Sequence, residues 1–179
     1  MAQEPRVVSR RLHLLRRPAA FELTMAGILL LVFAAVFVQH VRRLRAFAEE
    51  IAFRNTVGVL RDAVGMKLAL SLGKGDVAQV VAWAGRNPMR LLVVPPRNYV
   101  GVVNGPRSRR IKPGTWYFDR TDRMLVYRPA DARGLRTSLR PKRVRWQLRV
   151  VVRHKGGKEQ VVGLRLVPSP PYIWHLRNG

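Results

Sequence analysis

The chain has 179 residues, of which 47% are hydrophobic and 25% charged, and its formal net charge is +24. Its length suits one domain with an appended segment, and its composition excludes both a disordered chain and a multi-span membrane protein. Cysteine is absent, which excludes disulfides and thiol chemistry. The positive charge predicts attraction to anionic partners such as phospholipid headgroups or nucleic acid, although a compositional bias towards arginine explains it equally well.

The first predicted element is an apolar segment at residues 21–38, which follows a basic stretch at residues 1–20. No charged residue lies between Met25 and Val38, and a bilayer core needs roughly 20 helical residues, so the segment is long enough to span a membrane. Arginines flank it with a small excess upstream, which favours a cytoplasmic N-terminus. No small-residue cleavage pattern follows the segment, so we expect no cleavage after it.

Residues 39–72 continue the same helix, because this stretch contains no proline and no turn signal. We therefore expect one helix from Phe21 to about Leu72, which ends at the glycines of Gly73–Gly75. Its second half has an apolar stripe that fits packing on a folded domain. The residues of this stripe recur mostly at spacings of three or four: Phe47, Ile51, Phe53, Val57, Leu60, Val64 and Leu68.

Residues 73–179 read as a small globular domain. Asp76 is a good N-cap for a short helix over 76–86, and the later apolar runs between Pro, Gly, Asn and Asp predict strands and turns. Residues 143–167 predict a hairpin whose first strand alternates apolar residues with arginines. The proline-rich tail after it is expected at a surface or an edge.

The predicted fold class is therefore α+β, with a long N-terminal helix followed by a small antiparallel sheet. With the residues RRPAA before FELTMAGILLLVF, this layout resembles the type IV pilins and the pseudopilins of type II secretion systems. The later stretches NPMRLLVVPPRNYVG and PGTWYFDRTDRMLVYRP are also similar to the globular part of such proteins. The resemblance implies a pilin-like fold.

The resemblance also implies how the chain is processed and where it works. A prepilin peptidase would remove the leader between Ala20 and Phe21, and Phe21 would become the N-methylated first residue. The mature chain would be a single-pass protein of the bacterial inner membrane, with its globular domain in the periplasm. Its partners would be other pilin or pseudopilin subunits and an inner-membrane assembly platform, and its role would be that of a minor subunit of a pilus or pseudopilus. Secretion, adhesion, motility and DNA uptake all remain open as the role of that filament.

Two positions depart from the family's pattern. Ala20 stands where leaders of this family usually end in glycine, and Met25 stands where the family has the glutamate that pairs with a neighbouring subunit. Glu22 is the acid nearest to that position. It is the candidate for subunit pairing, and it equally fits a side chain that reaches water at the membrane interface, beside the positive end of the helix dipole. The absence of the glutamate at Met25 also fits a subunit near the filament tip.

The helix residues expected to contact lipid or a filament core are all apolar. They are Leu23, Ile28, Leu29, Leu30, Leu31, Phe33 and Phe37. In such a core the helices would exchange one apolar environment for another, so packing and charge pairing would decide their specificity.

We expect no enzyme activity, no metal and no cofactor. The four histidines are far apart in the sequence, and no hydrolase, phosphate-loop or zinc-protease motif occurs. Asp119 and Asp122 fit a tight turn better than a Ca²⁺ site. The aromatic run 116–118 is expected to be core packing.

An alternative function is nucleic-acid binding by a pilin-like protein or a membrane-anchored scaffold. The predicted contacts are arginines of two segments: Arg109, Arg110, Arg143, Arg145, Arg149 and Arg153. No aromatic residue interleaves the strand arginines as a stacking platform for bases would require, so a simple solvated sheet face is favoured over this alternative.

Overall fold

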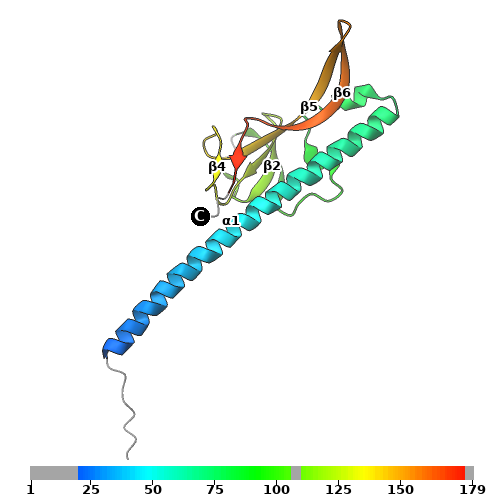
Figure 1. Ribbon diagram of the computed structural model, residues 1–179. Coiled ribbons are helices and arrows are strands. Elements are labelled where there is room, and N and C mark those ends of the chain that lie inside the picture. Colours follow the sequence, from blue (N-terminus) through cyan, green and yellow to red (C-terminus); the bar gives the residue numbers. More distant parts are fainter. Residues whose placement is uncertain (1–19, 106–109, 176–179) are drawn as a thin grey trace, which may run out of the picture. The chain divides into compact units, whose positions relative to one another are not determined.

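The computed structural model of the protein describes residues 20–105 and 110–175. It is an α+β structure, in which one long N-terminal helix, α1 (Ala20–Gly73), precedes a mixed, mostly antiparallel sheet (Figure 1). The chain divides into two compact units after Arg42. The first contains the N-terminal part of α1, and the second contains the rest of α1 and every strand. Apart from Ala20, the predicted leader lies outside the described residues.

The C-terminus of α1 is closed by a glycine, as predicted. Gly75 has φ of 69°, and its N–H donates to the carbonyl of Leu72 at 2.9 Å. The N–H of Asp76 donates to the carbonyl of Ser71 at 2.9 Å. These two bonds satisfy carbonyls that a helix end leaves without partners, so the chain turns sharply after Gly73.

A short helix, α2 (Val77–Ala82), follows, and the side chain of Asp76 caps it by accepting a hydrogen bond from the N–H of Gln79 at 2.9 Å. The predicted range 76–86 is too long. Gly85 adopts φ of 66°, and its N–H donates to the carbonyl of Leu148 at 2.9 Å. A left-handed residue bonded to a strand cannot continue an α-helix, so α2 ends early. The 3₁₀-helix η1 (Pro88–Leu91) comes next.

The main sheet has five strands in the order β1-β2-β3-β5-β6. Its strands are β1 (Tyr99–Val103), β2 (Thr115–Asp119), β3 (Met124–Arg128), β5 (Val144–Lys155) and β6 (Lys158–Pro168). Three of the four pairings are antiparallel, but β1 and β2 are parallel. The prediction of a purely antiparallel sheet is therefore wrong at β1. A two-residue turn cannot join parallel neighbours, and eleven residues separate β1 from β2 in the sequence.

The core of the second unit lies between α1 and one face of this sheet. The inner stripe of α1, defined as Phe53, Val57, Leu60 and Val64, is buried there. The ring of Phe53 stacks on that of Trp116, with centroids 5.2 Å apart and planes 1° from parallel. Stacked aromatic pairs of this kind add to the burial energy of both rings.

One predicted member of the stripe is wrong. The side chain of Ile51 is 57% exposed, and the buried positions before Phe53 are Glu50, one turn away, and Ala46, two turns away. Residues two apart on an α-helix point in nearly opposite directions, so Ile51 and Phe53 cannot share a face.

The hairpin β5–β6 turns at Gly156 and Gly157, whose φ angles are 58° and 73°. Two successive left-handed residues match the two-residue turn that suits a twisted hairpin. The apolar side chains of β5 become more exposed towards this turn: Val144 is 1% exposed, whereas Val152 is 42% exposed. Figure 1 shows why, since the end of the hairpin extends beyond the other strands.

The C-terminal tail contributes to the core. It forms β7 (Ile173–Trp174), which pairs with β4 (Leu135–Arg136) in a separate two-stranded sheet. Trp174 is only 4% exposed, and its ring centroid lies 4.9 Å from that of Phe53. The tail forms a small edge strand, and its Trp174 side chain is buried in the core.

Candidate functional site

The first candidate site is the apolar part of α1, which is long and apolar enough to cross a membrane. The helix begins at Ala20, so the predicted cleavage position before Phe21 and the acid Glu22 fall within its first turn. The hydroxyl of Thr24 donates to the carbonyl of Phe21 at 2.8 Å. The predicted lipid- or filament-facing residues are all exposed: Leu23, Ile28, Leu29, Leu30, Leu31, Phe33 and Phe37. Met25 is also exposed, at 62%.

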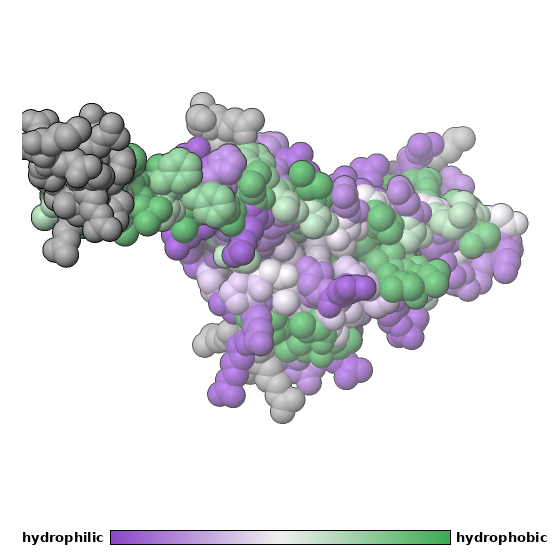
Figure 2. All heavy atoms as spheres, turned by 90° about the horizontal axis from the view of Figure 1, so that it is seen from below, coloured by the Kyte–Doolittle hydropathy of each residue, from purple (hydrophilic) through white to green (hydrophobic). Residues whose placement is uncertain are grey.

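Within the second unit, α1 has a further apolar face that the sheet does not cover. We define its exposed large residues as the outer stripe: Leu44, Ile51, Val59, Met66 and Leu70. At about 100° per residue they fall on the side of the helix opposite the inner stripe. The face of the molecule in Figure 2 carries green apolar patches among purple polar ones. Exposed apolar residues in a line are typical of a surface that packs against a partner.

Gly58 and Gly65 lie beside the outer stripe. A Cβ atom built on either glycine would meet nothing within 4 Å in the described chain. Glycine costs about 1 kcal/mol relative to alanine inside a helix. Packing within the described chain does not require a glycine at either position, because a larger side chain would meet nothing there. Small residues of this kind allow two helices to approach closely.

Two adjacent glutamates fasten α1 to the rest of the second unit. Glu49 accepts hydrogen bonds from the hydroxyl of Tyr127 at 2.8 Å, from the N–H of Ala130 at 2.6 Å and from the N–H of Asp131 at 3.0 Å. Burial, together with the neighbouring Glu49 carboxylate, raises the pKa of Tyr127 above its ordinary value. The phenol therefore stays protonated and acts as the donor.

Glu50 has a related role at the C-terminal tail. Its carboxylate is 2.5 Å from a guanidinium nitrogen of Arg54. The same nitrogen donates to the carbonyl of Trp174 at 3.1 Å and lies 3.0 Å from Nδ1 of His175. The apolar pattern of the sequence assigned no role to either glutamate. The missed signal was the position of Glu50, which lies three residues before Phe53 and thus on the buried side.

The predicted arginine ladder is not one continuous solvated face. Arg149 and Arg153 are exposed, but the Arg145 guanidinium forms an ion pair with Asp122 at 3.3 Å, and its side chain is 19% exposed. Nε of Arg143 is shielded from solvent and has no hydrogen-bond partner among the described residues. Arg110 is exposed, and Arg109 lies outside the described residues.

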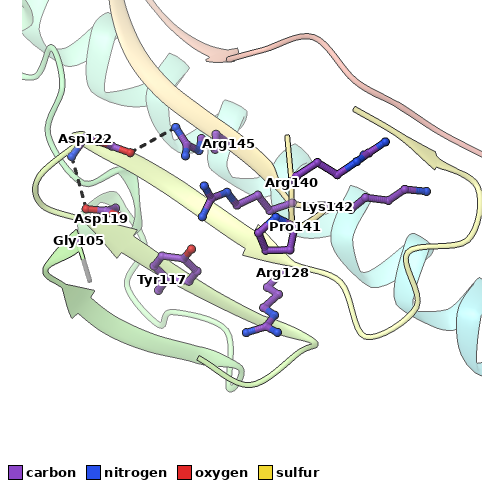
Figure 3. Close-up of a pocket in the computed structure, with 10 residues that line it drawn as sticks. Gly105, Tyr117, Asp119, Asp122, Arg128, Arg140, Pro141, Lys142 and Arg145 are labelled. Carbon is purple, nitrogen blue, oxygen red and sulfur yellow. Dashed lines mark hydrogen bonds and ion pairs between the residues drawn. The ribbon is translucent and has the colours of Figure 1, made fainter. Parts of the chain in front are cut away.

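Arg143 and Arg145 instead line a pocket of about 740 Å³ on the sheet face opposite α1 (Figure 3). Tyr117, Val126 and Arg145 are cross-strand neighbours on this face. Tyr117 is also buried, at 1% exposed, but on this face of the sheet. Trp116 and Phe118, the other two residues of the predicted aromatic run, belong to the core under α1. Five cationic side chains line the pocket: Arg128, Arg140, Lys142, Arg143 and Arg145.

The two acids of the pocket are already engaged. Asp119 is 6% exposed, and its Oδ1 accepts hydrogen bonds from the N–H groups of Thr121 at 3.0 Å and of Asp122 at 3.4 Å. These bonds make the tight turn that the sequence predicts for FDRTDR. Asp122 pairs with Arg145, as the dashed line in Figure 3 marks. Among the residues that the structure describes, no group of three or more metal-ligating side chains occurs.

Comparisons with known proteins found no relative of this chain. No family model matches the chain, and neither a curated protein nor a solved structure matches it.

Proposed function

We propose that the protein is a minor pilin- or pseudopilin-like subunit, anchored in a bacterial inner membrane by the apolar part of α1 and assembled with other subunits through α1. The observation that carries the proposal is the distribution of apolar residues along this helix. Its first part is apolar and exposed, and its second part has one stripe against the sheet and another that nothing in the described chain covers.

This distribution favours assembly over simple anchoring. An anchor needs an apolar segment of about 20 residues and no more, because that length spans the bilayer core. The outer stripe places exposed apolar side chains from Leu44 to Leu70, beyond the segment that a membrane requires, and the polar Asn55 and Asp62 lie among them on the same side of the helix. A helix of a neighbouring subunit would bury this stripe, and burial of apolar surface outside lipid is favourable by about 25 cal/mol per Å².

The departure from the family's pattern at Met25, with Glu22 as the nearest acid, then has a physical explanation. Glu22 in the first turn is the acid available to a neighbouring subunit or to the chain's own new amino group, and a negative charge is favourable at a helix N-terminus. Met25 offers no charge to a neighbour. We infer that a prepilin peptidase exposes the amine of Phe21 and that an inner-membrane assembly platform moves the mature chain into a filament.

The absence of cysteine allows a direct test of the outer stripe. A single Val59→Cys substitution, labelled with a photoreactive maleimide in membranes, should cross-link to the helix of a second subunit, identified by peptide mapping. The matched control is Gln160→Cys, an exposed position on β6. Equal cross-linking from both positions, or none from Val59, would contradict the proposal.

A further inference from the structure

We infer that the pocket on the outer face of the sheet is a binding site for a compact phosphate-bearing ligand. This inference does not rest on the proposed role in a filament. It rests on the cavity, on the charges that line it and on the unpartnered Nε atom of Arg143.

The cavity has the size and walls of a ligand site. Its volume of about 740 Å³ lies within the range of roughly 300–1,000 Å³ that small-molecule sites occupy. The main sheet forms its floor: Tyr117 and Asp119 come from β2 and Arg145 from β5. Figure 3 shows Pro141 beside Arg140 and Lys142. Strands hold such a floor more rigidly than loops do, which favours a defined site.

The charge of the pocket selects an anion. Five cationic side chains face two acids, and both acids are used within the fold, by the turn at Asp119 and by the ion pair with Arg145. Lys142 donates to the carbonyl of Ala132 at 3.3 Å and Arg140 to that of Thr137 at 3.4 Å, so both have neutral partners that leave their charge uncompensated. Guanidinium groups gathered at one place match the oxygens of a phosphate.

Arg143 provides the independent observation. A shielded N–H without an acceptor costs stability. Three side chains in the described chain have such an atom, and Arg143 is the one that is cationic and lines the pocket, the others being Trp146 and Trp174. The side chain of Arg143 lines the pocket next to Arg145, two residues along the chain. A small shift of the Arg143 side chain would bring Nε to a phosphate oxygen in the pocket, which would supply the acceptor that this N–H lacks. The limited volume favours a compact ligand over an extended polymer.

The test uses the full chain in detergent and measures pyrophosphate binding by equilibrium dialysis at constant ionic strength. We expect one saturable site. The pair Arg143→Gln and Arg145→Gln should weaken binding about tenfold or more, because it removes two charge-assisted contacts. The matched pair Arg149→Gln and Arg153→Gln removes the same charge from the exposed part of β5 and should change affinity by less than about twofold. Equal weakening by both pairs, or no saturable site, would overturn the inference.

A second measurement does not depend on the folding of variants. In the wild-type chain, pyrophosphate should protect Arg143 but not Arg149 from an arginine-selective reagent, as mapped by mass spectrometry. Lack of protection at Arg143 would count against the site. Displacement of pyrophosphate by glycerol 3-phosphate or by phosphatidylglycerol vesicles would show whether a free or a lipid-borne phosphate is preferred, and either result supports the inference. If both pairs of substitutions weakened the binding of a single-stranded oligonucleotide equally, this would instead indicate an extended nucleic-acid-binding face.

Discussion

The hydroxyl of Tyr127, on β3, donates a hydrogen bond of 2.8 Å to the carboxylate of Glu49, on α1. The two residues are 78 positions apart, and the same carboxylate accepts the N–H groups of Ala130 and Asp131 just after the strand. One side chain therefore fixes the register between the helix and the sheet. The inner stripe supplies apolar contact, and Glu49 supplies a directional bond that apolar packing lacks.

Tyr127→Phe should lower the free energy of unfolding of the detergent-solubilised chain by about 1–2 kcal/mol, because a hydrogen bond to a charged group is lost while the ring remains. Glu49→Ala should cost more, since two backbone N–H groups also lose their acceptor. Denaturation followed by near-ultraviolet circular dichroism measures both values. Glu159→Gln, at an exposed pair with His154, is the control and should have little effect. A Tyr127→Phe chain as stable as the wild type would show that the bond is not part of this register.

Tyr172 should make the fold sensitive to alkali. Burial raises the pKa of its phenol to about 12, an effect that the nearby Arg61 and Arg54 cations partly oppose. The ordinary pKa of tyrosine is about 10, so an unfolded chain loses this proton at lower pH than the folded one. The stabilisation is complete below pH of about 10 and is lost as the pH rises towards the folded value.

The check is to compare the wild type with Tyr172→Phe between pH 9 and pH of about 12. The wild-type chain should lose more stability over this range than the variant. Phenolate absorbance should also show one late-titrating tyrosine fewer in the variant than in the wild type, since Tyr127, whose pKa is also raised, is present in both. Parallel pH profiles for the two chains would disprove this role of Tyr172.

Gly58→Ala and Gly65→Ala should each stabilise the isolated chain by about 1 kcal/mol, because a helical glycine is replaced where the new Cβ meets nothing. The reverse change, Ala52→Gly at another exposed helical position, should destabilise it by a similar amount. If a neighbouring helix packs at the outer stripe, the same alanines should reduce photocross-linking from position 59. Loss of stability in the isolated chain would mean that these glycines have a role within the subunit.

Periodicity was sufficient to predict α1, since the proline-free stretch and the spacing of Phe53, Val57 and Leu60 define both its length and its buried face. It was also sufficient for the β5–β6 hairpin, where strict alternation ends in two glycines. It failed at Ile51, which is apolar but points away from the sheet, because hydrophobicity alone does not separate two apolar stripes on one helix. The position of the sheet shows which of the two stripes is buried, and Ile51 belongs to the exposed one.

The parallel pairing of β1 and the pocket could not be predicted from local patterns. Both depend on contacts between segments far apart in the sequence, such as Arg145 with Asp122. The sequence indicated that Arg143 and Arg145 share a strand face. It did not indicate that Tyr117 and Asp119 lie beneath them, because strand order is a tertiary property.

The mass of the N-terminal peptide of the mature chain is the most direct test of the proposed function. The chain is extracted from the inner membrane of cells that contain a prepilin peptidase, and its N-terminal peptide is determined by mass spectrometry. A peptide that begins at Phe21 and has one added methyl group is the predicted result. An Ala20→Arg variant, which removes the small residue before the cleavage position, should stay uncut. A wild-type chain that begins at Met1 or Ala2 in those cells would contradict the assignment.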